Sequence, residues 1–328
     1  MLSYWQDYPE IQTKLERVQN VMVERLKINN DDIRAALEKF SKNGGKMVRP
    51  ALFFLFASLS NLTEDDEKLS NLTKIAASLE MLHSATLIHD DIIDDSPLRR
   101  NLPSIQSQFG KDIAVYAGDF IYTVYFELLV ETMSGTDFLA RNAKSMKKIL
   151  SGELTQMQTT FDTENTVKKY LKAINGKTAE LLSLSCLEGA YFSGMDKKTQ
   201  AQAAKIGRAI GLAFQIYDDI LNFTIGLEEE NKPILTDFRQ GIFTLPVLIA
   251  KQNQPEQIIP YMNRAADLTK AECVKLAELV DDANGISESL LFASNLTNIA
   301  LKAIEKLPDC EARQILLEAT EKLLERNY

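Results

Sequence analysis

Apolar side chains recur at helical spacing along almost the whole chain, with polar and charged residues between them. Apolar positions three and four residues apart are typical of an α-helix with one buried face. Only 14 glycines and 9 prolines interrupt the 328 residues, so an all-α protein is predicted. The pattern predicts helices near residues 8–26, 30–41, 47–61, 68–94, 111–133, 137–160, 164–173, 177–193, 198–223 and 241–252, with two or three more to the end.

Breaks between the predicted helices are short. Asn43-Gly44-Gly45 separates the second helix from the third, and Ser96-Pro97 with Pro103 marks a loop after the fourth. Residues 224–240 form a polar loop, and Thr163-Glu164 is typical of a helix start. No linker, tandem repeat or low-complexity segment divides the chain, so a single domain over residues 1–328 is expected.

Composition narrows the class of partner. Hydrophobic residues are 45% of the chain, which is enough for a sizeable core, and the net charge of -9 disfavours nucleic acid and anionic membranes as main partners. The three cysteines are widely scattered and form no disulfide framework. No signal peptide and no apolar run of about 18 residues is evident, so a cytoplasmic protein without a membrane span is expected.

The most informative segment is acidic and directly follows an apolar helical run. It holds four carboxylates within six residues: Asp90, Asp91, Asp94 and Asp95. A second pair, Asp218-Asp219, ends another apolar helix, and Asn222 lies one turn after Asp218. Two acidic helix ends repel each other unless cations lie between them, and Mg²⁺ prefers carboxylate and phosphate oxygens. The interpretation is a diphosphate held between two helices by magnesium; a solvated cluster of acids and bases is the ordinary alternative.

Cations flank this segment. Lys46 and Arg49 follow two glycines at a helix start, and Arg99-Arg100 follows the acidic run. Backbone N–H groups, an ammonium and guanidinium groups together suit a diphosphate, although ordinary surface cations are the alternative. His83 lies two helical turns before Asp90 and is either a core histidine or a phosphate donor. Neither histidine belongs to a zinc-ligand cluster.

Some positions are ambiguous when taken singly. Thr178 follows Lys177 at a predicted helix start and is typical of a cap, and Gln215 is typical of a buried amide. Small and apolar side chains precede Asp90 on its helix: Ser78, Met81, Leu82, Ala85 and Thr86. These side chains either line a hydrophobic tunnel or pack against a neighbouring helix, and the periodicity of the sequence does not distinguish these two interpretations.

Six segments together resemble a known family, the head-to-tail trans-isoprenyl diphosphate synthases (polyprenyl synthetases). They are Gly-Gly-Lys-Met-Val-Arg-Pro at 44–50, Leu-Ile-His-Asp-Asp-Ile-Ile-Asp-Asp at 87–95, Arg99-Arg100, Gly-Lys-Thr at 176–178, Phe-Gln-Ile-Tyr-Asp-Asp-Ile-Leu at 214–221 and Gly-Ile-Phe-Thr-Leu-Pro at 241–246. Each is weak alone, but six in the family order are specific. The resemblance implies an all-α bundle of antiparallel helices around a deep central cavity, usually as a homodimer.

The resemblance also implies a role for each matching residue. The metal positions, for two or three Mg²⁺ ions, are Asp90, Asp91, Asp94, Asp218 and Asp219, with Asp90, Asp94 and Asp218 as direct ligands. Those that match the isopentenyl diphosphate site are Lys46, Arg49, His83 and Arg100. The residues that match contacts to the allylic diphosphate are Arg99, Lys177 and Lys232. The residues that match positions facing the allylic cation are Lys177, Thr178 and Gln215.

Two positions depart from the family pattern. The second motif usually ends in Asp where this chain has Asn222, and a Lys often follows the glycine where this chain has Ile242. Asparagine offers a carbonyl oxygen without charge, so one magnesium is expected to bind less tightly. Long-chain and two-component members tolerate both changes.

The resemblance predicts a prenyltransferase that extends an allylic diphosphate with isopentenyl diphosphate. Short-chain relatives often have a bulky aromatic residue four or five positions before the first Asp, where this chain has Thr86 and Ala85. A product of about hexaprenyl to octaprenyl length is therefore expected, of the kind used for quinone side chains. The positions expected to set its length are Met81, Leu82, Ala85, Thr86 and Phe120, with Tyr122 or Tyr125 as further floor candidates.

Alternatives remain open. The chain is expected to be active alone or to be the large chain of a two-component heptaprenyl synthase that needs a small regulatory subunit. A shorter-chain geranylgeranyl or farnesyl diphosphate synthase is a second alternative. A terpene cyclase is disfavoured because cyclases generally lack the cations at Lys46, Arg49 and Arg100. A purely structural helical protein would not explain six motifs in order, and transient membrane contact is compatible with release of an apolar product.

Overall fold

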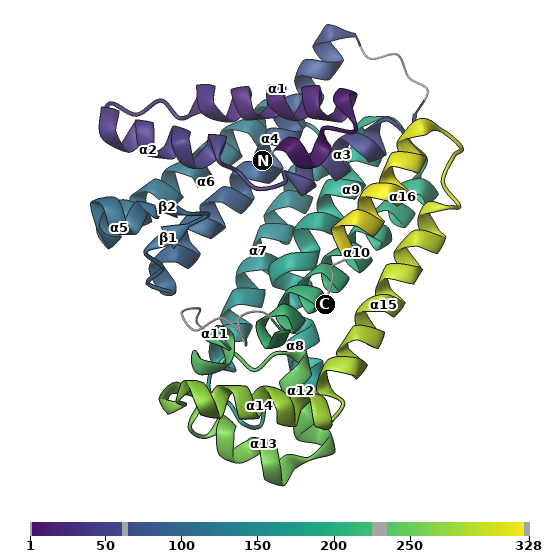
Figure 1. The fold of residues 1–328 in the computed structure, drawn as a ribbon. Coiled ribbons are helices and arrows are strands. Elements are labelled where there is room, and N and C mark those ends of the chain that lie inside the picture. Colours follow the sequence, from purple (N-terminus) through teal and green to yellow (C-terminus); the bar gives the residue numbers. More distant parts are fainter. Residues whose placement is uncertain (1, 61–64, 225–234, 325–328) are drawn as a thin grey trace. The chain divides into compact units, whose positions relative to one another are not determined.

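The computed structural model describes residues 2–60, 65–224 and 235–324, and these residues are mainly helical (Figure 1). The all-α prediction is confirmed. Among the described residues the strands are β1 (Leu98–Arg99) and β2 (Leu102–Pro103), which pair as one short antiparallel hairpin. The expected long helices are present, with ends within a few residues of the predicted bounds.

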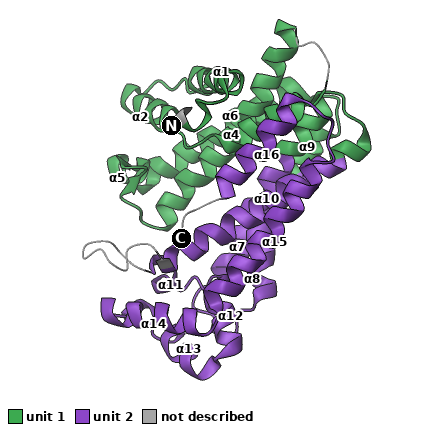
Figure 2. Ribbon diagram, turned by 45° about the vertical axis from the view of Figure 1, so that its right-hand side comes forward, with its two compact units in different colours: residues 1–143, 185–200 green, residues 144–184, 201–328 purple. Residues whose placement is uncertain are grey.

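The chain divides into two compact units (Figure 2). Unit 1 contains residues 1–143 and 185–200, and unit 2 contains residues 144–184 and 201–328. Three helices contribute residues to both units: α7 (Phe138–Gln158), α9 (Glu180–Phe192) and α10 (Lys197–Thr224). The expectation of a single domain over residues 1–328 stays a prediction.

Unit 1 is built around its longest helix. Its elements outside the three shared helices are a 3₁₀ helix (Leu2–Trp5), α1 (Pro9–Arg25), α2 (Asp31–Lys42), α3 (Val48–Ala57), α4 (Asp66–Ile93), the hairpin, α5 (Ile105–Phe109) and α6 (Lys111–Met133). α4 packs against α1, α3, α5 and α6, and its side chains are buried on several sides. A helix surrounded in this way needs apolar and small residues around most of its circumference, which is what its sequence offers.

Two glycines allow close helix packing in unit 1. A Cβ at Gly118 of α6 would lie 2.4 Å from His89 Nε2 of α4. A Cβ at Gly189 of α9 would lie 2.2 Å from the backbone oxygen of Phe53 in α3. A larger residue at Gly189 would force α9 away from α3, because the atom it meets is backbone, whereas at Gly118 the His89 ring would have to move.

The sequence was not expected to contain a helix long enough to cross a membrane, and α6 departs from that expectation. Lys111–Met133 is long and apolar enough to cross a bilayer, judged by length and composition only. In its most apolar stretch, 44% is buried inside the protein. Its buried side chains belong to a face that packs along α4. A core helix of this kind meets the same test as a membrane span, so α6 alone is weak evidence for one.

Unit 2 carries the second half of the sequence motifs. Its further elements are α8 (Val167–Ile174), a π-helical turn (Asn175–Ala179), α11 (Thr236–Arg239), α12 (Leu245–Asn253), α13 (Pro255–Met262), a 3₁₀ turn (Ala265–Asp267), α14 (Lys270–Asp282), α15 (Gly285–Ile304) and α16 (Glu311–Leu324). α12 packs against α8, α13, α14 and α15, and α15 packs against α16. The C-terminal region therefore contains more helices than the two or three expected.

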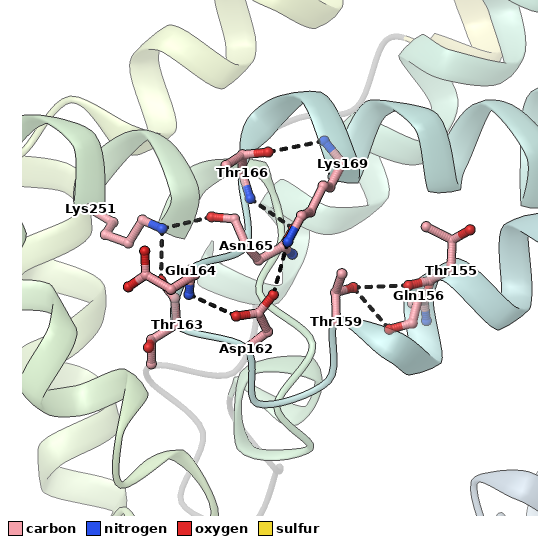
Figure 3. A network of polar contacts seen from close by, with 10 residues as sticks. All are labelled: Thr155, Gln156, Thr159, Asp162, Thr163, Glu164, Asn165, Thr166, Lys169 and Lys251. Carbon is pink, nitrogen blue, oxygen red and sulfur yellow. Dashed lines mark hydrogen bonds and ion pairs between the residues drawn. The ribbon is translucent and has the colours of Figure 1, made fainter.

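The connection between α7 and α8 is a polar turn (Figure 3). Lys251 of α12 donates to the backbone oxygens of Thr163 at 2.8 Å and Asn165 at 2.6 Å. The predicted helix start at Thr163-Glu164 is wrong, because the backbone N–H of Glu164 bonds to the Asp162 side chain instead. Thr166 is the actual N-cap of α8.

The structure also differs from the predicted helices in its shortest elements and at a glycine with positive φ. The short helices α5 and α11 and the hairpin strands were not predicted, because elements of two to five residues carry no periodicity. The helix expected from residue 241 begins at Leu245, since Gly241 has a φ of 78° and cannot lie in a helix. Most of the expected loop at 224–240 lies outside the described residues.

A carboxylic acid is buried in the core of unit 1. Glu188 Oε1 accepts a hydrogen bond from Asn142 Nδ2 at 2.6 Å, and the Asn142 Oδ1 accepts one from the Tyr125 hydroxyl at 3.1 Å. Glu188 Oε2 is buried without a hydrogen-bond partner. Burial raises the pKa of Glu188 to about 8, so the group is largely neutral at neutral pH.

Glu188→Gln should change how stability depends on pH. The folded chain holds the Glu188 proton more tightly than the unfolded chain, so this contribution is complete below the unfolded pKa and is lost as pH rises toward 8. Glutamine does not titrate, so the variant should gain on the parent by roughly 1.4 kcal/mol per pH unit between pH 5 and 7.5. Urea unfolding across this range measures the difference. Glu127→Gln, on the exposed side of α6, should leave the slope unchanged, and equal slopes for both variants would contradict the assignment.

Candidate active site

The first acidic motif ends α4, and its carboxylates divide into inward and outward groups. Asp91 is 1% exposed, and its Oδ1 accepts hydrogen bonds from Arg99 Nε at 2.8 Å and Nη2 at 2.5 Å. Burial raises the pKa of Asp91, and the Arg99 guanidinium opposes that rise. Asp90 is half-buried and Asp94, one turn later, is exposed. Direct ligation by Asp90 and Asp94 stays a prediction, and Asp91, also named as a metal position, is paired with Arg99.

The loop after α4 presents the two arginines. Lys111 pairs with Asp95 across 2.9 Å, and this pair lies where the helix has ended. The hairpin turns through Arg100 and Asn101, which have φ angles of 52° and 62°. A two-residue hairpin loop with positive φ at both positions matches the twist of its strands. Arg99 and Arg100 thus occupy fixed places on a tight turn, which the sequence had predicted only as an irregular loop.

A partly buried cluster brings three of the predicted phosphate-binding residues near a glutamate that was not predicted. Glu80 of α4 is 4% exposed, and the positive charges of Arg49 and Arg100 oppose the burial that raises its pKa. Burial and the same two charges hold the pKa of His83 well below its usual range, so its ring is neutral at neutral pH. Gly45 allows this arrangement, because a Cβ there would lie 2.9 Å from Arg100 Nη2. Glu80 is recognisable in the sequence only as one acid within an apolar helix.

Lys46 lies beside this cluster at the start of α3. Its side chain is exposed and its ammonium is 4.6 Å from the centre of the Tyr4 ring. A cleft opens nearby, lined on one side by α2 and on the other by the hairpin and α5, and its polar lining includes Asn43, Arg99 and Arg100. Arg100 Nη1 donates to the Asn43 carbonyl at 3.0 Å.

Lys177 lies in the π-helical turn Asn175–Ala179, where a new helix start was predicted. The prediction is wrong because α8 runs through this wider turn directly into α9, and π turns are frequent at functional sites. Lys177 Nζ pairs with Glu153 Oε2 of α7 at 2.9 Å. α7 approaches closely because Gly152 has no side chain; a Cβ there would lie 2.5 Å from the Lys177 backbone nitrogen.

A chain of hydrogen bonds links the second acidic motif to this turn. Thr178 Oγ1 donates to Gln215 Oε1 at 2.7 Å, and Gln215 Nε2 donates to Asp219 Oδ1 at 2.9 Å. The Tyr170 hydroxyl donates to Asp219 Oδ2 at 2.5 Å. Both oxygens of Asp219 are therefore engaged, and burial raises its pKa to about 7. Asp218 is exposed and remains suited to direct ligation.

Both departures from the family pattern contact Asp237, Asn222 at its carboxylate and Ile242 at its backbone oxygen. Asn222 Nδ2 donates to Asp237 Oδ2 at 2.6 Å, and the Ile242 backbone N–H donates to the Asp237 backbone oxygen at 2.8 Å. Asp237 was not predicted, because it lies in a short polar segment without a pattern. Lys232, predicted to contact the allylic diphosphate, lies outside the described residues.

The chemical type of the available donor atoms suits magnesium. Hard carboxylate oxygens are available at Asp90 and Asp94 in unit 1 and at Asp218 in unit 2. Across residues 2–60, 65–224 and 235–324, no three His, Cys, Asp or Glu side chains converge into a complete metal site. Mg²⁺ commonly takes one or two carboxylates and completes its shell with water and substrate phosphate, so these donors suit a metal that arrives with a diphosphate.

The positions expected to set product length lie on the two packed helices of unit 1. Met81, Leu82 and Ala85 of α4 are fully buried. Thr86 is half-buried and its hydroxyl donates to the His83 carbonyl at 2.8 Å, and Phe120 of α6 is half-buried. The tunnel itself stays a prediction.

Comparison with known proteins gives the class. The model of the Polyprenyl synthetase family matches residues 30–280. A chloroplastic solanesyl-diphosphate synthase 2 of Oryza sativa subsp. japonica is 34% identical over 307 residues, which cover 90% of this chain and 73% of that protein. Component 2 of the heptaprenyl diphosphate synthase of Bacillus subtilis is 31% identical over 286 residues, covering 87% of this chain and 80% of that protein.

A solved structure agrees over nearly the whole length. The geranylgeranyl pyrophosphate synthase of Lactobacillus brevis superposes with a TM-score of 0.92 at 34% identity, covering 98% of this chain and 99% of that one. The chain belongs to the polyprenyl synthetase family. It is a prenyltransferase of isoprenoid synthesis that acts on isoprenyl diphosphates, in a family that generally depends on Mg²⁺. The predicted family, fold class and enzyme class are confirmed.

Gly152→Ala should destabilise the protein, although alanine is normally the better helix residue. The new methyl group would meet two backbone atoms of the π turn and one of α8, the nearest at 2.5 Å. We expect a loss of about 1–3 kcal/mol in the free energy of unfolding and a fall in turnover, measured by urea denaturation and steady-state kinetics. Ser151→Ala, an exposed neighbour on α7, is the matched control. A variant as stable as Ser151→Ala would contradict the close approach.

Proposed function

We propose that this enzyme condenses isopentenyl diphosphate head-to-tail with an allylic prenyl diphosphate and gives a trans product of about hexaprenyl to octaprenyl length. Family membership supports the reaction class. The observation that carries the proposal is the division of the carboxylates: within each acidic motif one aspartate is buried on internal partners and another faces solvent. Such a division suits carboxylates that receive a metal-bound diphosphate.

Isopentenyl diphosphate is assigned to the cluster of Lys46, Arg49, His83 and Arg100. Two guanidinium groups and an ammonium offset the charge of a diphosphate. His83 is neutral and donates one N–H without adding charge. The Glu80 carboxylate lies within electrostatic range of both arginines and offsets their mutual repulsion before substrate binds.

The allylic diphosphate is assigned to Arg99, Lys177 and Lys232, with Asp90, Asp94 and Asp218 as the ligands of two or three magnesium ions. Bound Mg²⁺ supplies charge neutralisation to the diphosphate as it leaves. Arg99 and Lys177 are each held by an acid, Asp91 and Glu153, so both are in place before the leaving group develops its charge.

The allylic cation needs dipoles that stabilise it without reacting. We assign this role to the carbonyls of the π turn at Lys177, to Thr178 and to the Gln215 amide, which Asp219 orients through a hydrogen bond of 2.9 Å. The double bond of isopentenyl diphosphate attacks the cation, and a proton is then lost. The released diphosphate is the base we propose, since the reaction requires no protein nucleophile.

Product length is assigned to the residues below Asp90 on α4. Ala85 is small and lies one helical turn and one residue before Asp90, so the space there admits a growing chain; Met81 and Leu82 lie a further turn away. One isoprene unit is comparable with one helical turn of about 5.4 Å. A chain of six to eight units therefore has to pass beyond these residues, toward Phe120 and its neighbours on α6. Quinone side chains use products of this length.

We propose a homodimer that buries the outer face of α6. Five large apolar side chains of this helix are exposed: Ile113, Val115, Tyr116, Phe126 and Val130. Apolar surface of this extent on one helix is typical of an interface. A cytoplasmic location, with transient membrane contact during product release, is supported by the net charge of -9 and the scattered cysteines.

A two-component enzyme is the second candidate. The Bacillus relative is named component 2 of a heptaprenyl diphosphate synthase, and its likeness extends over 87% of this chain. In that case the chain described here would be the large catalytic subunit. A shorter geranylgeranyl product is the remaining alternative, in view of the Lactobacillus structure.

Asp90→Asn should remove nearly all turnover. The variant keeps the side-chain size but loses the charge that binds magnesium, and we expect kcat/KM to fall about 100-fold or more. The assay uses purified chain, Mg²⁺, labelled isopentenyl diphosphate and farnesyl diphosphate. Asp95→Asn, in the same acidic run but paired with Lys111, should retain most activity. Near-normal turnover and magnesium dependence in Asp90→Asn would refute the ligand assignment, and an inactive parent chain would favour the two-component enzyme.

Ala85→Phe should shorten the product. A phenyl ring at this fully buried position blocks the path beyond the first units, so the distribution should shift to farnesyl and geranylgeranyl lengths. Reversed-phase thin-layer chromatography of the dephosphorylated products measures it. Ala35→Phe adds the same ring on the exposed side of α2 and should not alter the distribution. An unchanged product in a stable Ala85→Phe variant would place the tunnel elsewhere.

A further inference from the structure

Two aromatic residues near the N-terminus contact the predicted phosphate-binding lysine. Tyr4 and Trp5 belong to the 3₁₀ helix Leu2–Trp5 of unit 1, and they precede residues 30–280, over which the family model matches. Their contact with Lys46 spans more than forty positions of sequence. A family pattern confined to residues 30–280 contains no information on this contact.

Trp5 holds the backbone of Lys46. Its indole Nε1 donates to the Lys46 carbonyl at 2.5 Å, and the side chain is 1% exposed. A buried indole N–H requires an acceptor, and this carbonyl meets the requirement. The next residue, Met47, has a φ of 48° and a ψ of 44°, which is the left-handed region. A strained residue of this kind persists when its surroundings restrain it, and the Trp5 hydrogen bond restrains the peptide that precedes it.

Tyr4 holds the side chain of Lys46. The Lys46 ammonium lies 4.6 Å from the centre of the Tyr4 ring, within the range of a cation–π contact. The Tyr4 and Trp5 rings meet edge to face at 5.0 Å, and Tyr8 packs on Trp5 at 6.2 Å. The Tyr4 ring is thus fixed by the buried tryptophan. Burial raises the pKa of Tyr4 to about 12, so its phenol stays neutral.

We infer that Tyr4 and Trp5 are positioning residues that prepare Lys46 for the diphosphate of isopentenyl diphosphate; the inference rests on the proposed role of Lys46. An exposed lysine otherwise loses the freedom of four side-chain torsions when it binds phosphate. Holding the backbone and the ammonium beforehand reduces that loss, which is the general effect of preorganisation. The contact should therefore affect the affinity for one substrate and leave the chemical step unchanged.

The test compares three variants of the full chain. Tyr4→Leu removes the ring face, Trp5→Phe removes the indole donor but keeps most of the bulk, and Tyr4→Phe keeps the ring face as the matched control. We expect KM for isopentenyl diphosphate to rise about fivefold in Tyr4→Leu and Trp5→Phe, and to stay within about twofold in Tyr4→Phe. kcat and KM for the allylic substrate should stay within about twofold in all three.

Lys46→Met separates this inference from the proposed function. If Lys46 binds the diphosphate, Lys46→Met raises KM for isopentenyl diphosphate, and adding Tyr4→Leu to it causes no further rise. A raised KM in Lys46→Met with parental values in Tyr4→Leu and Trp5→Phe overturns the inference alone. An unchanged KM in Lys46→Met overturns the assignment of Lys46 and this inference with it. Equal losses for both substrates, persisting in the Lys46→Met background, would show a merely structural role and also overturn it.

Trp5 offers a direct readout besides activity, because it is the one tryptophan of the chain. Titration with isopentenyl diphosphate, without allylic substrate, should change its fluorescence and give a dissociation constant. That constant should rise about fivefold in Tyr4→Leu and remain near the parental value in Tyr4→Phe. A dissociation constant that is identical in all three proteins would contradict the positioning role.

Discussion

Placing positive charge in a partly buried site requires a negative partner on the same chain, and the arrangement of this candidate site follows from that constraint. Arg99 lies against Asp91 and Lys177 against Glu153, while Glu80 is set among the positive charges of Arg49 and Arg100. Arg99 and Lys177 are held in ion pairs before substrate arrives, and the Glu80 carboxylate lies in the field of the other two guanidinium groups. A diphosphate carries more negative charge than any one of these carboxylates. It can therefore bind the cations beside the carboxylates or replace a carboxylate as the partner of its cation. The internal acids therefore have a part in binding although they touch no substrate in our proposal.

Close backbone approach is the second requirement. The π turn that carries Lys177 meets α7 where Gly152 leaves room, and the Arg100 guanidinium fits against the backbone at Gly45. At these two positions a Cβ would meet the site itself, at 2.5 Å and 2.9 Å. Gly152 thus lets α7 come close to the turn, and Gly45 of the first motif gives room to a guanidinium, in addition to any freedom that they give the backbone. The same physical reason explains Gly189, which meets the backbone of α3 in unit 1.

Much of the fold could be predicted because it depends on local pattern. Long amphipathic or apolar stretches determine long helices, and α6 was predicted with its observed bounds, Lys111–Met133. Elements of two to five residues, such as α5, α11 and the hairpin strands, carry too little pattern to be predicted. Near residue 163 the Glu164 backbone N–H donates to the Asp162 side chain, so the helix begins later than predicted. At residues 175–179 the helical path of α8 continues through the π turn, where a break between helices was expected. Both misses reflect interactions that residue type does not reveal.

The sequence by itself determined the helical class, the family motifs and the kinds of chemical group available to a diphosphate and its metal, because these depend on residue type and spacing along the chain. Only the tertiary structure decided which aspartate of each motif is engaged inside, Asp91 and Asp219, and which faces solvent. It also brought Glu80, Glu153, Tyr4 and Trp5 to the predicted cations. These partners lie on other turns or other helices, and their positions depend on how the helices pack. Burial, and with it the cost of an unpaired charge or donor, is a property of that packing.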